Sequence, residues 1–312
     1  MRRMQPLLSS AAALLLASGC AAQQVLPDIQ IMDTQVFSES ITSTRDGTVY
    51  AGSVKGNVYK APPGSATAEP WIRHSETNGI LTILGVLADE ARNTLWLCSV
   101  PNFFGPERSQ GTSALKAFDL TSGELKASYD FPPPASTCND ITLAADGTAY
   151  ATDTANGRLF KLAAGANTLE LFGEDKALVG VDGIAFSANG TLYVNNVRSQ
   201  QMLRVDINVD GTMGKLTQLK LSHELGGPDG LRLIDGNRFI QAEGQAGRLA
   251  IVTIDGDSAS LTVLRDDLIS SPGATVVGDT AYVIESNIQY LFDADLKGKE
   301  PPAFMLYAVP MP

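Results

Sequence analysis

The chain has 312 residues, 44% of them hydrophobic, so it is long enough to bury a large core. It carries 34 acidic against 23 basic side chains, and its formal net charge is −11. Nucleic acids and anionic membrane surfaces bind clusters of positive charge, so this composition argues against both as partners. Small molecules and cations remain the expected partners of a chain that we expect to be monomeric.

The N-terminus has the pattern of an export signal. Arg2 and Arg3 form its positive end, and the apolar stretch at 7–17 is too short to span a membrane comfortably. The segment ending at Cys20 is similar to a bacterial lipobox, in which the cysteine becomes the lipidated first residue. We therefore expect residues 1–19 to be removed, with ordinary cleavage nearby as the alternative. The mature protein would lie in a bacterial periplasm, either soluble or held at the membrane through a lipid anchor alone.

Beyond this leader, an apolar strand-like segment recurs six times, each time after a short polar stretch. The corresponding positions are 39, 84, 139, 182, 229 and 272, at intervals of 45, 55, 43, 47 and 43 residues. Such intervals are typical of a four-stranded blade with its loops. One blade cannot bury both of its faces, whereas six blades arranged radially cover one another. The sequence predicts an all-β chain, a single six-bladed β-propeller over residues 25–312 with a central metal site.

Tight turns separate the predicted strands of each repeat. Asp46-Gly, Asp146-Gly and Asn189-Gly supply the positive φ that a short hairpin requires. No stretch after the leader keeps an apolar period of three to four residues over several helical turns. To close the ring, we expect residues 25–36 to pair with strands near residues 304–309.

Two cysteines follow the leader cysteine. Cys98 ends a predicted inner strand of the second repeat, and Cys138 directly precedes Asn139 of the third. In an oxidising compartment the two could pair and brace the third repeat. The alternative is a pair of small buried thiols that only pack.

Oxygen donors stand at the same position of four repeats: Glu39, Asn139, Asp182 and Asp229. The innermost strands of a propeller start at the same end of the central channel, so these side chains are expected to converge. Three carboxylates facing one point would repel one another and would raise their pKa values. A divalent cation removes that conflict. Ligation by oxygen alone favours Ca²⁺, with Mg²⁺ or Mn²⁺ as alternatives, and leaves positions open for water and substrate.

A purely structural interpretation competes with this one. Asp and Asn are common in turns, and Asp182-Gly and Asp229-Gly could simply shape hairpins. However, the second and sixth repeats carry Leu84 and Pro272 at the corresponding place, so the fold does not require a donor there. The set of four therefore favours a metal site more than any single member does.

The end of the second strand in each repeat supplies further polar residues near the expected channel mouth. We expect these residues to contact substrate or to support the metal ligands, with solvated loop residues as the alternative: Asp153, Asn195, Asn196, Glu243 and Glu285. The two histidines, His74 and His223, lie off the repeat register, and surface positions are expected for them in preference to a proton shuttle.

At these residues the chain resembles the family of senescence marker protein, gluconolactonase and luciferin-regenerating enzyme, with diisopropyl-fluorophosphatase and the paraoxonases as more distant relatives. These proteins are six-bladed propellers, and the resemblance spans nearly the whole mature chain. The Cys138-Asn139-Asp140 triplet is similar to the fluorophosphatase pattern, and the segment around Asp229 to the fifth-blade signature of the family. One departure is Asp182, which stands where the family usually has Asn.

The resemblance implies that Glu39, Asn139, Asp182 and Asp229 hold one catalytic divalent metal. It further implies an exported hydrolase that opens a lactone or related ester by attack of metal-activated water. Asp229 would be the general base or, in a fluorophosphatase-like variant, the nucleophile. Two alternatives stay open: a phosphotriesterase-like hydrolase, and a non-enzymatic propeller that binds a ligand or a protein and carries a structural cation.

Overall fold

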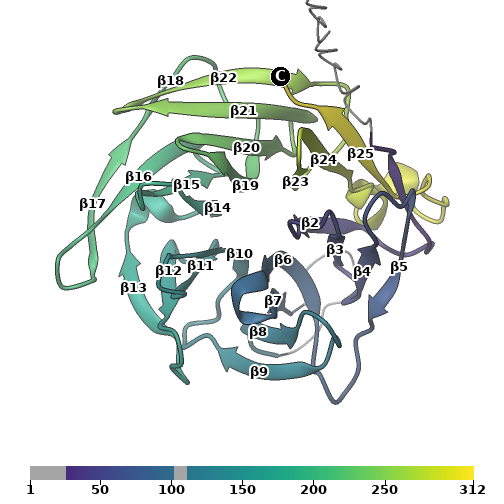
Figure 1. Ribbon diagram of the computed structural model, residues 1–312, viewed down its shortest axis with the longest axis horizontal. Coiled ribbons are helices and arrows are strands. Elements are labelled where there is room, and N and C mark those ends of the chain that lie inside the picture. The colour runs from purple at the N-terminus through teal and green to yellow at the C-terminus, as the bar shows by residue number, and fades with distance from the viewer. Residues whose placement is uncertain (1–25, 102–110) are drawn as a thin grey trace, which may run out of the picture.

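The computed structural model describes residues 26–101 and 111–312, and it shows a ring of radially arranged sheets (Figure 1). The predicted leader and Cys20 lie outside these residues. No helix among the described residues is long and apolar enough to cross a membrane. The predicted six-bladed propeller is confirmed: in the described chain each repeat forms one sheet of four or five strands, and its first strand lies nearest the centre of the ring.

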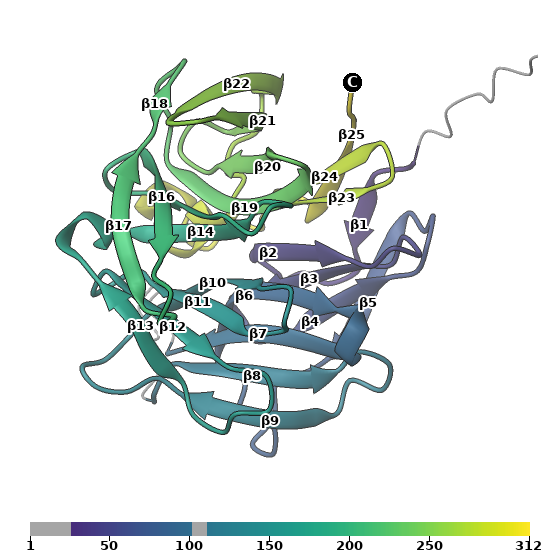
Figure 2. The same cartoon turned by 60° about the vertical axis from the view of Figure 1, so that its left-hand side comes forward.

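The first three blades run outward from the innermost strand in chain order, as β6 to β9 do in Figure 2. Blade 1 contains β2 (Ser38–Ser43), β3 (Val49–Ser53), β4 (Val58–Ala61) and β5 (Thr67–Ile72). Blade 2 contains β6 (Thr82–Asp89), β7 (Thr94–Val100), β8 (Ala114–Asp119) and β9 (Leu125–Asp130). Blade 3 contains β10 (Cys138–Leu143), β11 (Ala149–Asp153), β12 (Arg158–Leu162) and β13 (Glu170–Glu174).

The last three blades keep this order, with additions at their outer edges. Blade 4 contains β14 (Val181–Phe186), β15 (Leu192–Asn196), β16 (Gln201–Ile207) and β17 (Met213–Gln218). Blade 5 contains β19 (Pro228–Asp235), β20 (Arg238–Glu243), β21 (Arg248–Asp255), β22 (Ser258–Arg265) and the short outer strand β18 (Lys220–Leu221). Blade 6 contains β23 (Ala274–Val277), β24 (Thr280–Glu285), β25 (Met305–Pro310) and the N-terminal β1 (Ile29–Ile31).

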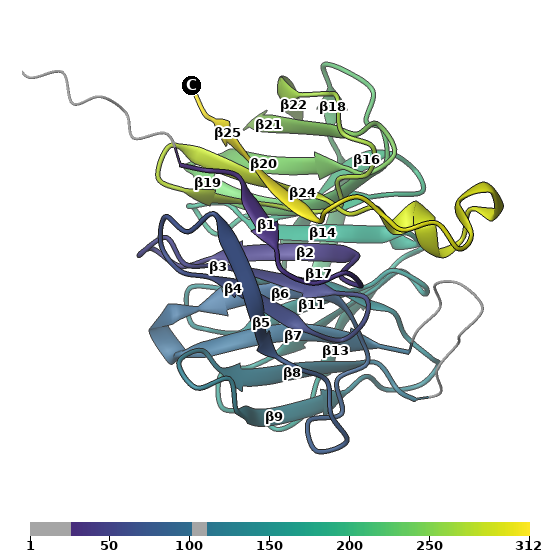
Figure 3. The ribbon, with the colours of Figure 1, turned by 90° about the vertical axis from the view of Figure 1, so that its right-hand side faces the viewer.

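Helical structure in the described residues is limited to short 3-10 turns: η1 (Glu90–Arg92), η2 (Lys176–Leu178), η3 (Ile288–Leu291) and η4 (Ala294–Leu296). The segment that carries η3 and η4 projects from one face of the ring (Figure 3). It connects β24 to β25 and so stands above blade 6.

Strand β1 closes the ring (Figure 3). It pairs antiparallel with β25, where Ile29 faces Leu306, which confirms the predicted pairing of the two ends of the propeller. It also pairs in parallel with β5 of blade 1, where Gln30 faces Thr67. Blades 1 and 6 are therefore joined into one continuous sheet through the first strand of the chain.

The core lies between blades. Each pair of neighbouring blades encloses its own apolar cluster, such as Leu115 and Ile141 between blades 2 and 3, or Ile240 and Val283 between blades 5 and 6. The predicted turns are also present: Gly47 and Gly147 have φ of 91° and 90°. These packed interfaces hold the innermost strands at fixed positions around the channel.

Candidate metal centre

The four predicted donors occupy equivalent places in the fold. Each is the second residue of an innermost strand, in β2, β10, β14 and β19. In all four strands the pairing with the second strand of the blade shifts register at the donor. The donor lies in a β-bulge of the innermost strand. Bulges re-aim side chains and are common beside functional sites. Blade 2 has the same shift next to Leu84, so the bulge belongs to the fold and the donors are placed on it.

The donor side chains meet across blades. Asn139 Nδ2 donates a hydrogen bond to Asp182 Oδ2 at 2.8 Å, over 43 residues of sequence. The carboxyl groups of Asp182 and Asp229 lie within hydrogen-bonding reach of each other. Glu39 is close enough for its charge to raise the pKa of Asp229. Residues of blades 1, 3, 4 and 5 thus converge at one end of the channel.

Crowding and burial disfavour negative charge on this cluster. Burial, and then the charge of Asp182, raises the pKa of Glu39 from 4.5 to about 8. Burial and the charge of Asp140 raise the pKa of Asp182, whose side chain is nearly inaccessible, from 3.8 to about 7. Burial and two neighbouring carboxylates raise the pKa of Asp229 well above its ordinary range. Among the described residues, no Lys, Arg or His forms an ion pair with Glu39, Asp182 or Asp229.

The donor chemistry fits a hard divalent cation, which would supply that missing charge. As the side chains stand, no group of three or more His, Cys, Asp or Glu in the described residues is arranged as a metal site. Asn139 presents its Nδ2 to Asp182 and donates with it to Thr154 Oγ1 as well. A half-turn of this carboxamide exchanges nitrogen and oxygen and would present an acceptor at the same point. The assignment of these four residues as ligands stays a prediction.

Neighbouring blades hold the backbone beneath these donors, a feature that the repeat pattern did not reveal. Thr152 Oγ1 of blade 3 donates to the carbonyl of Asp182 at 2.9 Å. Asn195 Nδ2 of blade 4 donates to the carbonyl of Asp229 at 2.6 Å. Because each contact spans two blades, the distance between successive donors is set by the packing of the ring.

The residues at the ends of the second strands are buried and already hydrogen-bonded. In every blade the side chain at this place binds the backbone of the loop that leads into the same blade: Ser53 with Val36, Ser99 with Leu81, Asp153 with Thr137, Asn196 with Val179, Glu243 with Gly226 and Glu285 with Ile269. Asp153 and Glu243 also pair with Arg158 and Arg248. These contacts show that the side chains hold the loops that lead into the innermost strands. A substrate role for these residues stays a prediction.

An ion pair beneath the donors escaped prediction altogether. Arg232 Nη1 of blade 5 donates to Asp140 Oδ2 of blade 3 at 2.7 Å, and the two side chains are only 13% and 5% exposed. Arg232 Nη2 also donates to the carbonyl of Val86 in blade 2 at 3.2 Å. The one available signal was that Arg232 stands three residues after a donor, where the other repeats have Thr, Ala or Leu.

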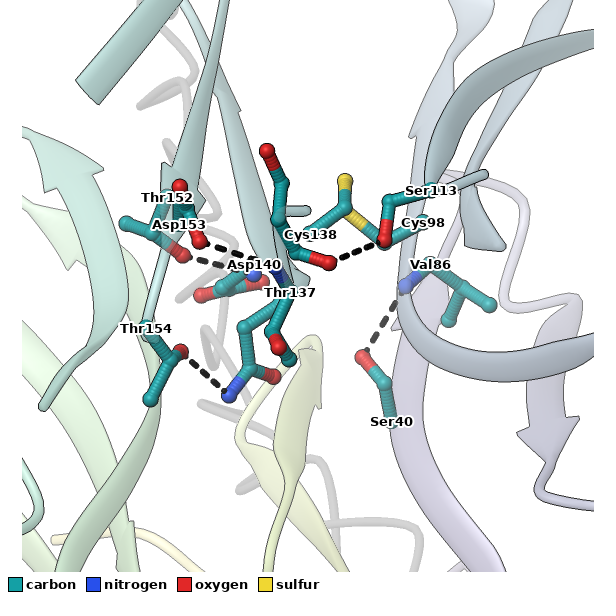
Figure 4. Close-up of a disulfide and its surroundings, with 12 residues drawn as sticks. Ser40, Val86, Cys98, Ser113, Thr137, Cys138, Asp140, Thr152, Asp153 and Thr154 are labelled. Atoms are coloured by element: carbon teal, nitrogen blue, oxygen red, sulfur yellow. Dashed lines mark hydrogen bonds between the residues drawn. A yellow bond between two sulfur atoms is a disulfide. The ribbon is translucent and has the colours of Figure 1, made fainter. Parts of the chain in front are cut away.

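Cys98 and Cys138 form a disulfide that joins β7 of blade 2 to β10 of blade 3 (Figure 4). Both cysteines are fully buried. The bond ends one residue before Asn139 and beside Asp140, so it anchors the strand that carries a predicted ligand. His74 and His223 are both exposed, as expected, and the ring of His223 is hydrogen-bonded to Ser222.

No protein-family model matches the chain, and no curated protein sequence matches it significantly. Solved structures do match. A luciferin-regenerating enzyme has a TM-score of 0.65 and 13% identity, covering 88% of this chain and 91% of its own. A gluconolactonase from Xanthomonas campestris has a TM-score of 0.65 and 15% identity, covering 94% and 100%. A calcium-binding protein, regucalcin, from Agrobacterium tumefaciens has a TM-score of 0.60 and 16% identity, covering 92% and 98%. At such identities the likeness establishes the fold, and the expected resemblance is confirmed at that level.

Proposed function

We propose that this chain is an exported, metal-dependent hydrolase that opens a lactone or a related carboxylic ester. The observation that carries the proposal is the convergence of Glu39, Asn139, Asp182 and Asp229, from four blades, at one end of the channel. The solved structures of similar fold include a gluconolactonase and a calcium-binding protein, which supports both the reaction and the ion. The disulfide supports export, because such bonds persist in oxidising compartments.

Glu39, Asn139, Asp182 and Asp229 would hold one divalent cation, with Ca²⁺ as the first choice. When bound, such an ion polarises an ester carbonyl and stabilises negative charge that develops on its oxygen. Ion binding requires ionised carboxylates, so it would also return the raised pKa values of the cluster toward their ordinary range.

Asp229 is the residue best placed to move a proton. Its side chain lines an open cleft of about 290 Å³, and its backbone carbonyl is held by Asn195. As a general base the carboxylate accepts a proton from the water whose oxygen bonds to the carbonyl carbon. The ring C–O bond then breaks, and the carboxyl group returns the proton to the alkoxide oxygen, which stays on the opened chain as the hydroxyl of a hydroxy acid.

Metal analysis combined with a lactone panel tests the proposal. The wild-type protein, Glu39→Gln and Asp229→Asn are dialysed against Ca²⁺, Mg²⁺ or Mn²⁺, and bound metal is measured. Hydrolysis of lactones and aryl esters is then followed with and without chelator. We expect about one ion per wild-type chain, loss of that ion in Glu39→Gln, and a loss of turnover of about 10²-fold or more in Asp229→Asn, which keeps most of its metal. The exposed Glu124→Gln and Asp210→Asn provide matched controls with the same chemical change.

The results separate three interpretations. Full activity of Asp229→Asn, or of wild type stripped of metal, contradicts the proposed mechanism. Tight binding of Ca²⁺ without hydrolysis of any ester would indicate a binding propeller with a structural cation. The Cys138-Asn139-Asp140 triplet keeps phosphotriesters on the panel, and cleavage of these in preference to lactones would favour the second hydrolase.

A further inference from the structure

The cleft beside Asp229 has apolar walls. It lies between the loop that leads into blade 6 and the segment that carries η3, and its apolar side chains are Val197, Ile269, Ile288 and Phe292. Of the described residues that line it, none is Lys, Arg or His. A volume of about 290 Å³ places it at the lower end of small-molecule pockets, roughly 300–1,000 Å³.

Two of these side chains are unusually exposed for their size. Ile269 is 66% and Phe292 is 63% accessible to solvent, although both are large and apolar. A single exposed apolar residue needs no explanation, but here two lie on the rim of the cleft that contains the proposed base. Apolar surface grouped around a catalytic carboxylate is the arrangement expected of a site for an apolar ligand.

The wall that carries Ile269 is held in place. The backbone N–H groups of Ile269 and Ser270 donate to the two carboxylate oxygens of Glu285, at 3.1 Å and 3.0 Å. The opposite wall is the 3-10 turn η3, which contributes Ile288 to the cleft. The backbone that carries these apolar side chains is therefore held in place by hydrogen bonds and by the turn η3. Side chains at fixed positions can discriminate between ligands of different shape.

The negative charge of the protein also favours an uncharged substrate. The chain carries a formal net charge of −11, and Asp229, which lines the cleft, has the carboxyl groups of Asp182 and Glu39 as neighbours. An anionic substrate would be repelled on approach, and the cleft has no basic side chain to receive it. The cleft offers Gln245, Ser270 and Gln289 as uncharged polar residues, but the hydroxyl groups of a polyhydroxylated sugar lactone that lie along Ile269, Ile288 and Phe292 would find no hydrogen-bond partner there.

We propose, resting on the hydrolase function above, that the substrate is an uncharged lactone or ester with an apolar alkyl or aryl substituent, and that Ile269 and Phe292 determine this specificity. The ester group lies against Asp229, and the substituent lies along the apolar wall. Each methylene buried there raises kcat/KM by about threefold to fourfold, until the wall is covered.

A series of lactones with increasing alkyl substituents, together with glucono-δ-lactone, tests this specificity. We expect kcat/KM of the wild-type protein to rise along the alkyl series and to be lowest for the sugar lactone. In Phe292→Ser and Ile269→Ser, the ratio of kcat/KM for the hexyl-substituted to the unsubstituted lactone falls by about tenfold. The exposed Leu171→Ser and Val209→Ser, which change apolar residues remote from the cleft, keep the wild-type ratio.

Calorimetric titration of the protein with the corresponding alkyl lactams separates this inference from the function it rests on, because the amide ring is not opened. Affinity that rises with chain length in wild type and not in Phe292→Ser supports the apolar cleft, even if no lactone is hydrolysed and the hydrolase function fails. Hydrolysis without any dependence on chain length, or lactam affinities that do not change along the series, overturns the proposed specificity and leaves the hydrolase function standing.

Discussion

The carboxyl groups of Glu39, Asp182 and Asp229 carry the main electrostatic strain of the described structure. Each belongs to a different blade, and each has a pKa raised first by burial. Their proximity to one another adds to the effect, because the charges of Asp182 and Glu39 raise the pKa of Asp229 further. A fold that keeps such a cluster without a compensating cation loses stability when the cluster ionises.

This arrangement predicts an unusual pH dependence for the metal-free protein. The pKa values of Glu39 and Asp182 are raised to about 8 and about 7, above those of the unfolded chain. Between about pH 4 and pH 8 the folded protein therefore keeps protons that the unfolded chain has released, and the free energy of unfolding falls as the pH rises. Thermal melts in chelator at pH 5, 6, 7 and 8 should show a falling Tm.

Two comparisons sharpen the measurement. Saturating Ca²⁺ should raise the Tm most at the highest pH, because it binds the ionised ligands. Glu39→Gln should weaken the pH dependence in chelator, whereas the exposed Glu124→Gln should not. A metal-free Tm that stays level or rises between pH 5 and pH 8 would show that these carboxyl groups do not share one buried site.

The convergence of the four donors could be predicted from the sequence, whereas the contact between Arg232 and Asp140 could not. Glu39, Asn139, Asp182 and Asp229 could be predicted because they repeat at one register, and a propeller converts register into proximity. Arg232 and Asp140 could not be paired, because their contact depends on how far one side chain reaches across the channel. The repeat identifies the blade and the strand position, but not the length and direction of an individual side chain.

At the level of elements, a hydrogen bond repeats at the end of each second strand and gives the side chains there a structural role beside the predicted one. Acidic and amide side chains near a channel mouth suggest substrate contacts, yet Asp153, Glu243 and Glu285 accept bonds from the backbone of the loops that lead into their own blades. A loop between blades leaves N–H groups without partners, and a side chain on the neighbouring strand satisfies them. The residue type varies because serine, amide and carboxylate can all do this.

The disulfide braces two elements at once, and its removal should be costly. It closes a loop of 40 residues between blades 2 and 3, for which the loss of chain entropy corresponds to about 3–4 kcal/mol. Replacing both Cys98 and Cys138 by Ala should lower the free energy of unfolding by about that amount in urea titrations. It should also weaken metal binding, since Cys138 precedes Asn139.

Reducing agent provides the control for this variant. Fully reduced wild type and the double variant should unfold at similar urea concentrations, because both lack the cross-link. An unchanged midpoint for the oxidised double variant would show that the packing of blades 2 and 3 alone holds β10 in place.

Across the whole molecule, Arg232 connects blades that the chain separates widely. Its guanidinium joins blade 5 to Asp140 of blade 3 and to Val86 of blade 2, and Asp140 also accepts from Ile184 N of blade 4 at 3.1 Å. Arg232 further lines a cavity of about 510 Å³ at the far ends of the innermost strands. Arg232 therefore lies between the predicted metal ligands and this cavity.

Removing this guanidinium should destabilise the ring. Arg232→Met leaves Asp140 buried without its partner, which we expect to cost about 3–5 kcal/mol in denaturant titrations. Arg238→Met, on the neighbouring strand, breaks an exposed pair with Asp235 and should have a much smaller effect, because solvent screens that pair. Combining Arg232→Met with Asp140→Asn should recover part of the loss. Equal effects of the two single variants would show that the central pair contributes no more than a surface one.

The overall architecture follows most directly from the sequence, and the reaction follows from it least directly. Intervals of 43 to 55 residues with Asp-Gly turns leave few folds other than a six-bladed ring. The same ring serves proteins described as a luciferin-regenerating enzyme, a gluconolactonase and a calcium-binding protein. The reaction depends on side chains at the channel mouth, such as those of the cleft beside Asp229, which the repeat does not specify.

The position of β1 makes this protein sensitive to the loss of residues Ile29–Ile31. Strand β1 covers the outer strand of blade 6 on one side and that of blade 1 on the other. A protease cut or an expression start beyond Ile31 would expose two unpaired β-edges on one molecule, and such edges readily pair with those of other chains. Self-association into aggregates, rather than simple unfolding, is the damage to be expected from loss of this strand.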